Sequence, residues 1–450
     1  MKQRLLSTDD TRKIHEAALR ILEELGMDVR DKETRADLFN AGCIEADTGY
    51  ILFPSKIVES ALASIPKSFI LYDRNGDPKV DVYDTVPHFG PGLNAINILD
   101  HRTSEQRECV LQDVHEAAKV CDQLSNIDMA SGLGNPCDLE PDEQCMGTIK
   151  AIMSETVKPF PFIAHNEVED VQVWEYIAEV AGGWDSLAEK PFALGLTGPY
   201  SPLELGEEAC RKLRFTARKH LPVVNYPAMI PGTTGPVTMA GAIAQSAAET
   251  LAGYVVHQLA EPGAPVITAS SILPMDLRTG VVAYGSPEYH LAGLGQIDYY
   301  NDLGVPTWIG AGCSDSHRFD TQAAYEAGAS MYTASLANTA FIHNLGFVSG
   351  GKSGSLELLV LADEIAGGVK QFMKGITVND ETLGVDVTQR NYINHEFMMD
   401  DHTLANMRTA IWDSKMLKRT PLEKWELAGA KSLEKRVREK LDDLLNTPKK

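Results

Sequence analysis

The fold is decided by the segment Val305-Pro-Thr-Trp-Ile-Gly-Ala-Gly-Cys-Ser-Asp-Ser-His-Arg-Phe-Asp-Thr-Gln-Ala-Ala-Tyr-Glu326. Its short apolar run, Pro306 to Ile309, ends in the glycine break Gly310 to Gly312. A polar loop follows, and a helix is expected to begin near Asp320. A buried strand, a glycine break and a polar loop in this order are typical of a barrel enzyme, which presents its chemistry at the carboxyl ends of its strands.

The same alternation of short apolar runs and helical stretches extends along much of the chain. The predicted strands are Ile127–Gly132, Phe160–His165, Phe192–Thr197, Val223–Tyr226, Val266–Ser270, Thr307–Gly310 and Ala340–Asn344. Helices are expected over residues 141–156, 168–181, 203–219, 237–260, 287–303, 320–337 and 355–372. This pattern implies a parallel sheet with right-handed crossovers.

We therefore predict an α/β protein with a closed (β/α)8 TIM-type barrel. Its eighth strand is expected at Ile376–Val378 or near Asn94–Leu99. An open doubly wound sheet is the alternative, although no full GxGxxG motif follows any predicted strand. The expected regions are an N-terminal helical cap or oligomerisation region (1–88), the catalytic barrel (89–380) and a C-terminal helical extension (381–450).

Composition narrows the classes of partner. The chain has 450 residues, 44% of them hydrophobic, and a net charge of −22, which argues against nucleic acid because phosphates repel an acidic surface. No apolar stretch approaches the roughly 20 residues that span a bilayer, so no membrane partner is expected. The N-terminal residues show no signal-peptide core, and the seven cysteines form no CxxC pair. A reduced, cytoplasmic setting is the simplest interpretation.

Aromatic residues recur where the predicted strands end. They are Tyr200, Tyr226, Trp308 and Phe347, and Phe89 would join them from a preceding loop. Aromatic faces attract a quaternary ammonium by roughly 0.5 to 2 kcal/mol per contact. Each residue alone could simply pack in a barrel, so the group predicts a cation site better than any member does.

Polar residues at these ends supply further candidates for substrate contact. His343, His317 and Asp315 are placed in the site, and one of the cations Arg278, Arg318 and Lys352 would pair with a substrate carboxylate. His165 is expected to be a structural residue whose ring nitrogens are hydrogen-bonded. Cys313 is expected to be an unreactive thiol. Cys313, Asp315 and the histidines could be imagined as a zinc site, but their spacing matches no compact zinc motif, and no metal is predicted.

The chain also contains a glycine-rich stretch after the predicted strand Ala340–Asn344. Residues Gly346 to Ser353 match the Walker A spacing, and a predicted strand precedes them. In phosphate-loop enzymes this motif usually opens the nucleotide domain, whereas here most strands come before it. A flexible loop that closes over substrate is the better interpretation.

Several ordered segments are similar to one enzyme family. They are Ile51–Ala63 with Pro66–Tyr72, Thr234–Gly241 with Ala248–Ala252, Gly285–Glu288, residues 310–326, and His402–Arg408 with Trp412. Together they resemble the trimethylamine:corrinoid methyltransferase family, in particular the branch that lacks pyrrolysine and demethylates quaternary amines. The chain is written in the ordinary twenty amino acids, and the residue equivalent to pyrrolysine is expected near 310–320.

The resemblance implies a barrel that moves a methyl group from a betaine-type quaternary amine to cob(I)alamin. That cofactor would be carried by a partner corrinoid protein, and no tightly bound cofactor of the chain's own is expected. A homo-oligomer is also expected. Two alternatives stay open: a zinc-assisted methyl transfer from a methanol-like or other donor, and a non-catalytic cytoplasmic ligand-binding barrel.

Overall fold

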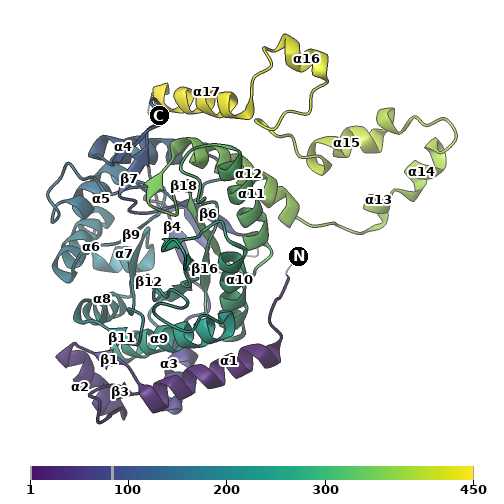
Figure 1. Cartoon of the computed structure of the whole chain (residues 1–450). Helices are drawn as coiled ribbons and strands as arrows, with labels where there is room; N and C mark the ends of the chain where they lie inside the picture. Colours follow the sequence, from purple (N-terminus) through teal and green to yellow (C-terminus); the bar gives the residue numbers. More distant parts are fainter. Residues whose placement is uncertain (1–2, 83–85, 449–450) are drawn as a thin grey trace.

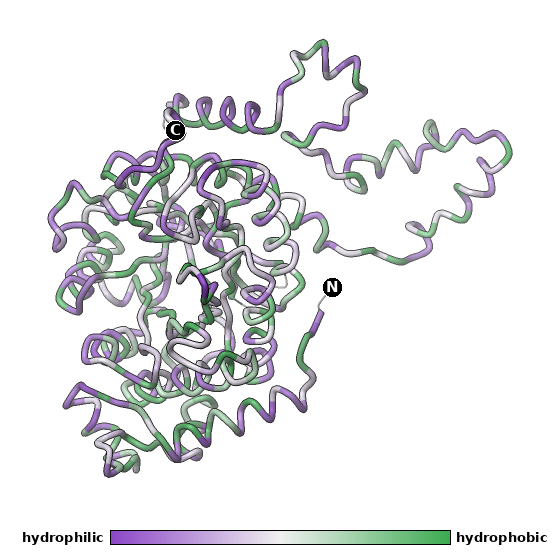
Figure 2. The backbone as a smooth tube through the Cα atoms, viewed as in Figure 1, coloured by the Kyte–Doolittle hydropathy of each residue, from purple (hydrophilic) through white to green (hydrophobic). Residues whose placement is uncertain are grey.

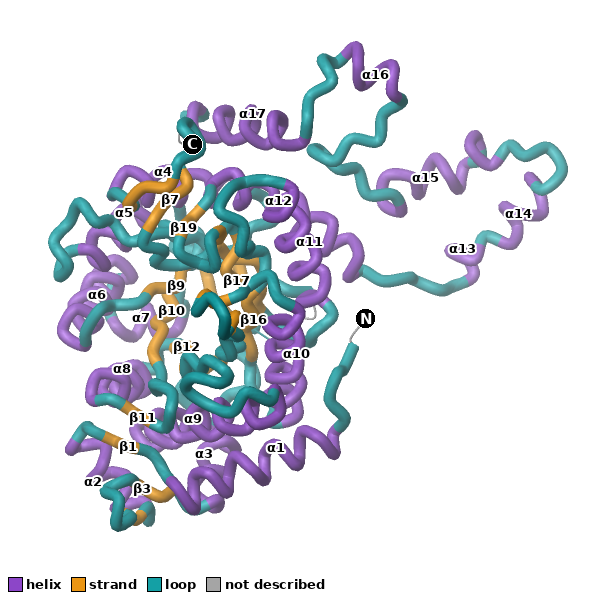
Figure 3. The backbone as a smooth tube through the Cα atoms, viewed as in Figure 1, coloured by secondary structure: helices purple, strands orange, loops and turns teal. Residues whose placement is uncertain are grey.

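At the centre of the protein, parallel strands lie inside a layer of helices (Figures 1 and 3). This computed structural model describes residues 3–82 and 86–448. Seven strands form one parallel sheet in the order β6-β17-β16-β13-β12-β10-β9. They are β6 (His88–Pro91), β9 (Phe160–Phe162), β10 (Ala193–Thr197), β12 (Val223–Asn225), β13 (Val266–Ala269), β16 (Thr307–Gly310) and β17 (Phe341–Leu345). The predicted (β/α) barrel class is confirmed.

An irregular segment joins the two ends of this sheet. The Asp128 N–H donates to the Phe89 carbonyl at 2.8 Å, and the Ala130 N–H donates to the Pro159 carbonyl at 2.9 Å. Residues 127–130 therefore lie between β6 and β9, in the second position of the barrel. The predicted strand Ile127–Gly132 is therefore not a regular strand, although residues 127–130 occupy its place between β6 and β9.

The eighth strand was predicted in the wrong place. The strand that completes the barrel beside β17 is β6, which pairs with β17 in parallel. Its sequence, His-Phe-Gly-Pro, lacks the apolar run by which the other strands were found. Ile376–Val378 forms no strand and is exposed. β7 (Asn97–Leu99) is a strand, but it belongs to a separate sheet.

The glycine-rich stretch, residues 346–353, contributes two strands to that separate sheet. Its order is β18-β19-β7-β8, with β8 at Gln106–Glu108, β18 at Phe347–Val348 and β19 at Ser353–Gly354. β18 and β19 pair antiparallel, so the Walker A match is a hairpin followed by a helix that Ser355 caps. A phosphate loop instead connects a strand directly to its helix.

Helices surround the barrel. They are α4 (Leu111–Gln123), α5 (Gln144–Glu155), α6 (Glu167–Ala181), α7 (Trp184–Glu189), α8 (Glu207–Arg218), α9 (Met239–Ala260), α10 (Pro287–Asp302), α11 (Thr321–Ser335) and α12 (Leu356–Met373). Asp320 and Ser355 cap α11 and α12 by accepting backbone N–H bonds in the first turn. Ser286 caps α10, which has Pro287 in its first turn, where a missing N–H costs nothing.

The N-terminal region packs on one side of the barrel. Its elements are α1 (Thr8–Arg20), a π-helical turn η1 (Ile21–Leu25), α2 (Lys32–Ala41) and α3 (Ser55–Ser64), with short strands β1 (Asp28–Val29), β2 (Ile44–Glu45), β3 (Ile51–Leu52), β4 (Ile70–Tyr72) and β5 (Pro78–Asp81). α1 and α3 contact α9, which is consequently buried on most of its circumference. β1 pairs with β11 (Glu204–Leu205), which follows β10.

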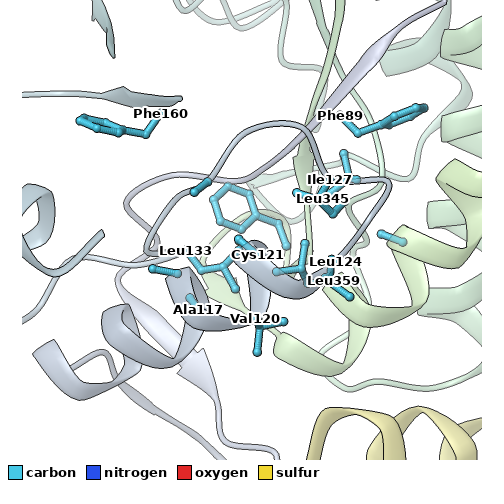
Figure 4. Close-up of a cluster of buried hydrophobic side chains, with 14 of the residues drawn as sticks. Phe89, Ala117, Val120, Cys121, Leu124, Ile127, Leu133, Phe160, Leu345 and Leu359 are labelled. Atoms are coloured by element: carbon cyan, nitrogen blue, oxygen red, sulfur yellow. The ribbon is translucent and has the colours of Figure 1, made fainter. Parts of the chain in front are cut away.

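The largest hydrophobic cluster lies between the barrel wall and its outer helices. Figure 4 shows part of it, with α4 side chains such as Val120 and Cys121 beside Leu345 and Leu359. Phe89 is fully buried in the same cluster. Figure 2 shows that hydrophobic residues concentrate along the central strands.

The C-terminal part leaves the body and returns (Figure 1). After α12 come α13 (Asp380–Leu383), α14 (Val385–Asn391), η2 (Phe397–Met399), α15 (Asp401–Ala410) and α16 (Leu422–Leu427). α17 (Leu433–Asn446) then packs against α12 and α4. Within residues 3–82 and 86–448, no helix has the length and apolarity needed to cross a membrane.

Candidate functional site

A cavity of about 230 Å³ opens at the carboxyl ends of the barrel strands. Leu93 and Asn94 follow β6, Tyr226 follows β12, and Ser270 follows β13. The full lining is Leu93, Asn94, Ile163, Leu196, Tyr226, Ala228, Ala269, Ser270, Ser271, Leu273, Tyr284, Tyr289, Trp308, Gly310, His343, Asn344, Phe347 and Gly351. A larger hollow of about 710 Å³ lies by α12, α16 and α17, away from the strand ends.

Aromatic side chains form much of the wall. The Trp308 indole meets the His343 imidazole edge to face, with ring centroids 4.2 Å apart. Tyr284 and Tyr289 make a second edge-to-face pair at 5.0 Å. Tyr226 and Phe347 also line the cavity. The site therefore offers several ring surfaces to one small ligand.

Glycines let these rings approach the strands. A Cβ added to Gly310 would lie 2.0 Å from the Tyr289 hydroxyl, and one added to Gly92 would lie 2.3 Å from the Phe347 ring. Both distances are far below van der Waals contact, so a side chain at either position would displace an aromatic wall residue. The glycine break after β16 is thus part of the cavity.

His343 is held as a neutral imidazole. Its Nδ1 lies 3.2 Å from the Pro91 carbonyl oxygen, which can only accept, so Nδ1 carries the proton. Nε2 is then left with a lone pair. Burial lowers the pKa of His343 to about 3, because a charged imidazole would lose its hydration.

The cavity carries no full charge within the described part of the chain. Its lining includes no Asp, Glu, Lys or Arg. Burial raises the pKa values of Tyr226 and Tyr289, so these phenols stay neutral. Asn94 and Asn344 supply amide groups, and both have left-handed backbone, with φ of 43° and 77°. Asn344 sits where the β17–β6 register shifts between Ile342 and Leu345, a kind of irregularity that is over-represented next to active sites.

Asp315 positions one side of the cavity from outside. Its carboxylate accepts the backbone N–H groups of Tyr284 and Gly285 at 2.8 and 2.9 Å. Glu326 in turn accepts the Asp315 N–H and the Ser314 hydroxyl. Burial raises the pKa of Asp315. These bonds fix the segment that carries Tyr284 to the loop after β16.

Four predicted site residues come together in the cavity lining: Tyr226, Trp308, His343 and Phe347. Phe89 packs in the main hydrophobic core (Figure 4) and is not part of the cavity lining. The Tyr200 side chain is exposed on the segment that leads to β11. Asp315 lies behind the wall, as described above.

The predicted cations lie elsewhere. Arg278 is at the tip of the hairpin formed by β14 (Met275–Asp276) and β15 (Val281–Val282), where it pairs with Asp276 and its side chain is 89% exposed. Arg318 is exposed and lies outside the lining. His317 is also exposed, and its Nδ1 contacts the Ser349 hydroxyl at 3.1 Å.

Tyr284, Tyr289, Asn94 and Asn344 were missed as site residues. Asn344 directly follows His343, and a strand-end search could have included it. Tyr284 and Tyr289 lie in the loop before α10 and in its first turns, where no strand ends. Asn94 follows β6, which has no apolar run to reveal it.

Within the described ranges, no group of three or more Cys, His, Asp or Glu side chains is arranged to hold a metal ion. Cys313 is fully buried, and burial raises the pKa of its thiol, which therefore stays protonated at neutral pH. His317 and Asp315 have the other partners described above.

All of residues 1–450 match the model of the trimethylamine methyltransferase family (MTTB). The chain is 30% identical over 449 residues to trimethylamine methyltransferase MttB of Desulfitobacterium hafniense, covering 98% of this chain and 88% of that one. It is 28% identical over 426 residues to a glycine betaine methyltransferase of Desulfitobacterium hafniense strain Y51, covering 94% and 88%. The crystal structure of a hydroxylamine MtmB complex shares the fold at a TM-score of 0.50 and 13% identity, over 98% and 95% of the chains.

Proposed function

Because the chain belongs to the trimethylamine methyltransferase family and is a methyltransferase, we propose that it demethylates a betaine-type quaternary amine. The acceptor would be cob(I)alamin on a separate corrinoid protein. One observation carries the choice of donor: the cavity is small, uncharged and walled by aromatic rings. A permanently charged ammonium is attracted to such rings without needing a counter-ion.

The wall suits the transition state as well as the substrate. When the methyl group departs, the C–N bond breaks and its electron pair stays on nitrogen, so the positive charge fades. A buried carboxylate would hold the cation most strongly before reaction and would thus favour the ground state. Rings and the neutral His343 acceptor hold it more weakly, and they lose less stabilisation as the charge disappears.

The residues would mainly position and desolvate the substrate. Trp308 and Tyr226 would contact the ammonium group, while the Gly351 side of the wall limits water access. Cob(I)alamin would supply the nucleophile from the open side of the cavity. A tertiary amine leaves without taking up a proton, so no general acid is required. The absence of pyrrolysine from this sequence is compatible with such a substrate.

The carboxylate of a betaine needs a partner of its own. Arg278 and Arg318 lie outside the cavity lining, whereas Asn94 and Asn344 lie in it. We propose that these amide N–H groups hold the carboxylate in place of a guanidinium. An uncharged anchor leaves the cavity neutral, so it does not repel the ammonium end of the same molecule.

The wider setting follows from the same proposal. A corrinoid protein would approach the carboxyl face of the barrel, and the chain would act in the cytoplasm as a homo-oligomer. The catalytic unit would be residues 89–380, flanked by the N-terminal region 1–88 and the extension 381–450.

Methyl transfer to cob(I)alamin, followed by its absorbance change, tests the proposal. Glycine betaine, proline betaine, carnitine, choline and trimethylamine would be compared with and without a chelator. Turnover of at least one betaine, faster than trimethylamine and unaffected by chelation, is expected. If trimethylamine turns over as fast as every betaine, the proposal that the methyl donor is a quaternary amine is wrong. Loss of activity with chelator would favour the zinc alternative, and binding without turnover in the presence of a competent corrinoid protein would favour a ligand-binding role.

A further inference from the structure

Residues 375–411, which we call the arm, stand clear of the body after α12 (Figure 1). Of the thirty-one large hydrophobic side chains that are exposed in the described part of the chain, twelve lie in these 37 residues. Ile376, Ile393 and Met398 are 87%, 75% and 81% exposed. Figure 2 shows hydrophobic stretches along the arm although it lies outside the core. Monomeric proteins rarely expose so much apolar surface in one place, and such surfaces mark interaction sites.

The arm nevertheless has a defined shape. Arg390 donates to both carboxylate oxygens of Asp400 at 2.6 and 2.7 Å and to Asp386 at 2.7 Å. Asn391 donates to the same Asp400 carboxylate at 2.6 Å. These bonds join α14 to the start of α15. The arm is thus held as a helical hairpin by polar contacts, while most of its hydrophobic side chains face outward.

The chain fixes the arm at both ends. It begins where α12 ends, and Gln371 of α12 donates to the Thr409 carbonyl at 3.1 Å where the arm returns. Beside its base, the rings of Tyr332 and Phe372 pack together at 5.8 Å, and both residues are exposed. The apolar surface therefore continues from the arm onto α11 and α12.

The arm leaves from the barrel end opposite the cavity. Near the end of α12, Lys370 contacts the Asn126 carbonyl and the Asp128 carboxylate, both at 3.0 Å. These residues begin the segment in the second barrel position, so they mark the amino ends of the strands. A protein that must reach the cavity would dock at the other face. The occupant of the arm is consequently a different molecule from the methyl acceptor's carrier.

We propose that the arm clasps a second copy of this chain, each copy placing its arm on the other. Every folded molecule of this chain exposes the hydrophobic arm. A partner that covers it must therefore always be present, and a second copy of the chain always is. A standard interface buries about 800 Å² per partner. Twelve side chains that each bury roughly 60 to 120 Å² supply this area. Reciprocal exchange forms a closed twofold assembly and leaves no arm uncovered.

Sedimentation equilibrium of the full chain tests this proposal. The wild type should have at least twice the mass of one chain. The triple variant Ile393→Glu, Met398→Glu and Leu404→Glu places three charges on the arm, and its mass should fall to one chain. The matched variant Ile96→Glu, Val168→Glu and Val180→Glu adds the same charges to exposed body positions and should keep the wild-type mass. Circular dichroism checks that both remain folded.

A second measurement does not depend on disruptive variants. A photo-reactive amino acid in place of Met398 should yield a covalent product of two chains on a denaturing gel. A monomeric wild type at all concentrations would overturn the proposal. So would an arm variant that stays assembled while Ile44→Glu in the N-terminal region dissociates it, because the interface would then lie there. A photoproduct confined to one chain would also overturn it.

Discussion

The Trp308 indole lies edge to face on the His343 imidazole, with centroids 4.2 Å apart and ring planes at 73°. The two residues come from neighbouring strands, because Gly310 of β16 pairs with His343 of β17. The contact orients a neutral acceptor and an aromatic wall toward one cavity. It is the feature on which the proposed binding of a cation depends most directly.

Trp308→Leu should reduce kcat/KM for a quaternary amine by about 2- to 30-fold, because one cation–π contact of roughly 0.5 to 2 kcal/mol is lost. Trp308→Phe keeps a ring and should lose less. Methyl transfer kinetics measure both, after thermal denaturation shows that the variants fold. If Leu and Phe have equal effects, Trp308 acts through packing alone.

Gly310→Ala should obstruct the cavity. The added Cβ would meet the Tyr289 hydroxyl at 2.0 Å and the Asn344 amide at 2.8 Å. Overpacking of this kind typically costs about 1 to 3 kcal/mol, and KM should rise as the wall shifts. Gly328→Ala is the control, since nothing lies within 4 Å of that Cβ in α11. Thermal unfolding and KM are measured together, and equal behaviour of the two variants would contradict the role given to Gly310.

The barrel could be predicted because its strands carry their own signal. β10, β12, β13, β16 and β17 are apolar runs that alternate with helices, and the predicted runs overlap them. β6 was not predicted as a strand because His88 and Pro91 interrupt any apolar pattern. Its place in the barrel depends on pairing with β17, more than 250 residues away in the sequence. Such pairing follows from barrel closure and not from local sequence.

The site was predictable only in part, for a related reason. Tyr226, Trp308, His343 and Phe347 sit at strand ends, where side chains converge by geometry. Tyr284 reaches the cavity because Asp315 binds the backbone beside it, a contact that no spacing reveals. Arg278 and Arg318 follow strands closely in sequence, but their loops carry them to the surface.

Substrate affinity should be insensitive to pH between about 5.5 and 8. An ordinary histidine, with a pKa of about 6.5, would become charged in this range and repel an ammonium group. The pKa of His343 is lowered to about 3, so it stays neutral. The unfolded chain takes up this proton more readily, and stability from this group therefore declines as the pH falls from 6.5 toward 3. Calorimetric titration with a turnover-inactive analogue measures affinity, and a tenfold loss near pH 6 would contradict the neutral imidazole.

Asp170→Asn should stabilise the protein at alkaline pH. Burial raises the pKa of Asp170 to about 7 from an ordinary value of 3.8, and its Oδ2 has no hydrogen-bond partner among the described residues. The folded state therefore binds the proton more tightly, and stability from this group is lost as the pH rises from about 4 to 7. The variant should gain about 1 to 3 kcal/mol in free energy of unfolding at pH 8 and less at pH 5. Urea unfolding of the wild type and the variant at pH 5 and pH 8 measures this gain. If the gain is the same at both pH values, the pKa of Asp170 is not raised in the folded state.

The anchor of the substrate carboxylate separates the amide proposal from the arginine expected from sequence. Asn344 lines the cavity, whereas Arg318 is exposed beyond its wall. Asn344→Ala should therefore weaken a betaine more than choline, which has no carboxylate, by about 10- to 150-fold, because a hydrogen bond to a charged group contributes roughly 1.5 to 3 kcal/mol. Arg318→Ala should change both ligands by less than about twofold, as a solvated charge contributes little. KM values for the two donors measure the difference. A selective loss of betaine binding in Arg318→Ala, with Asn344→Ala neutral, would mean that the loop after β16 folds inward when substrate binds and that the guanidinium is the anchor.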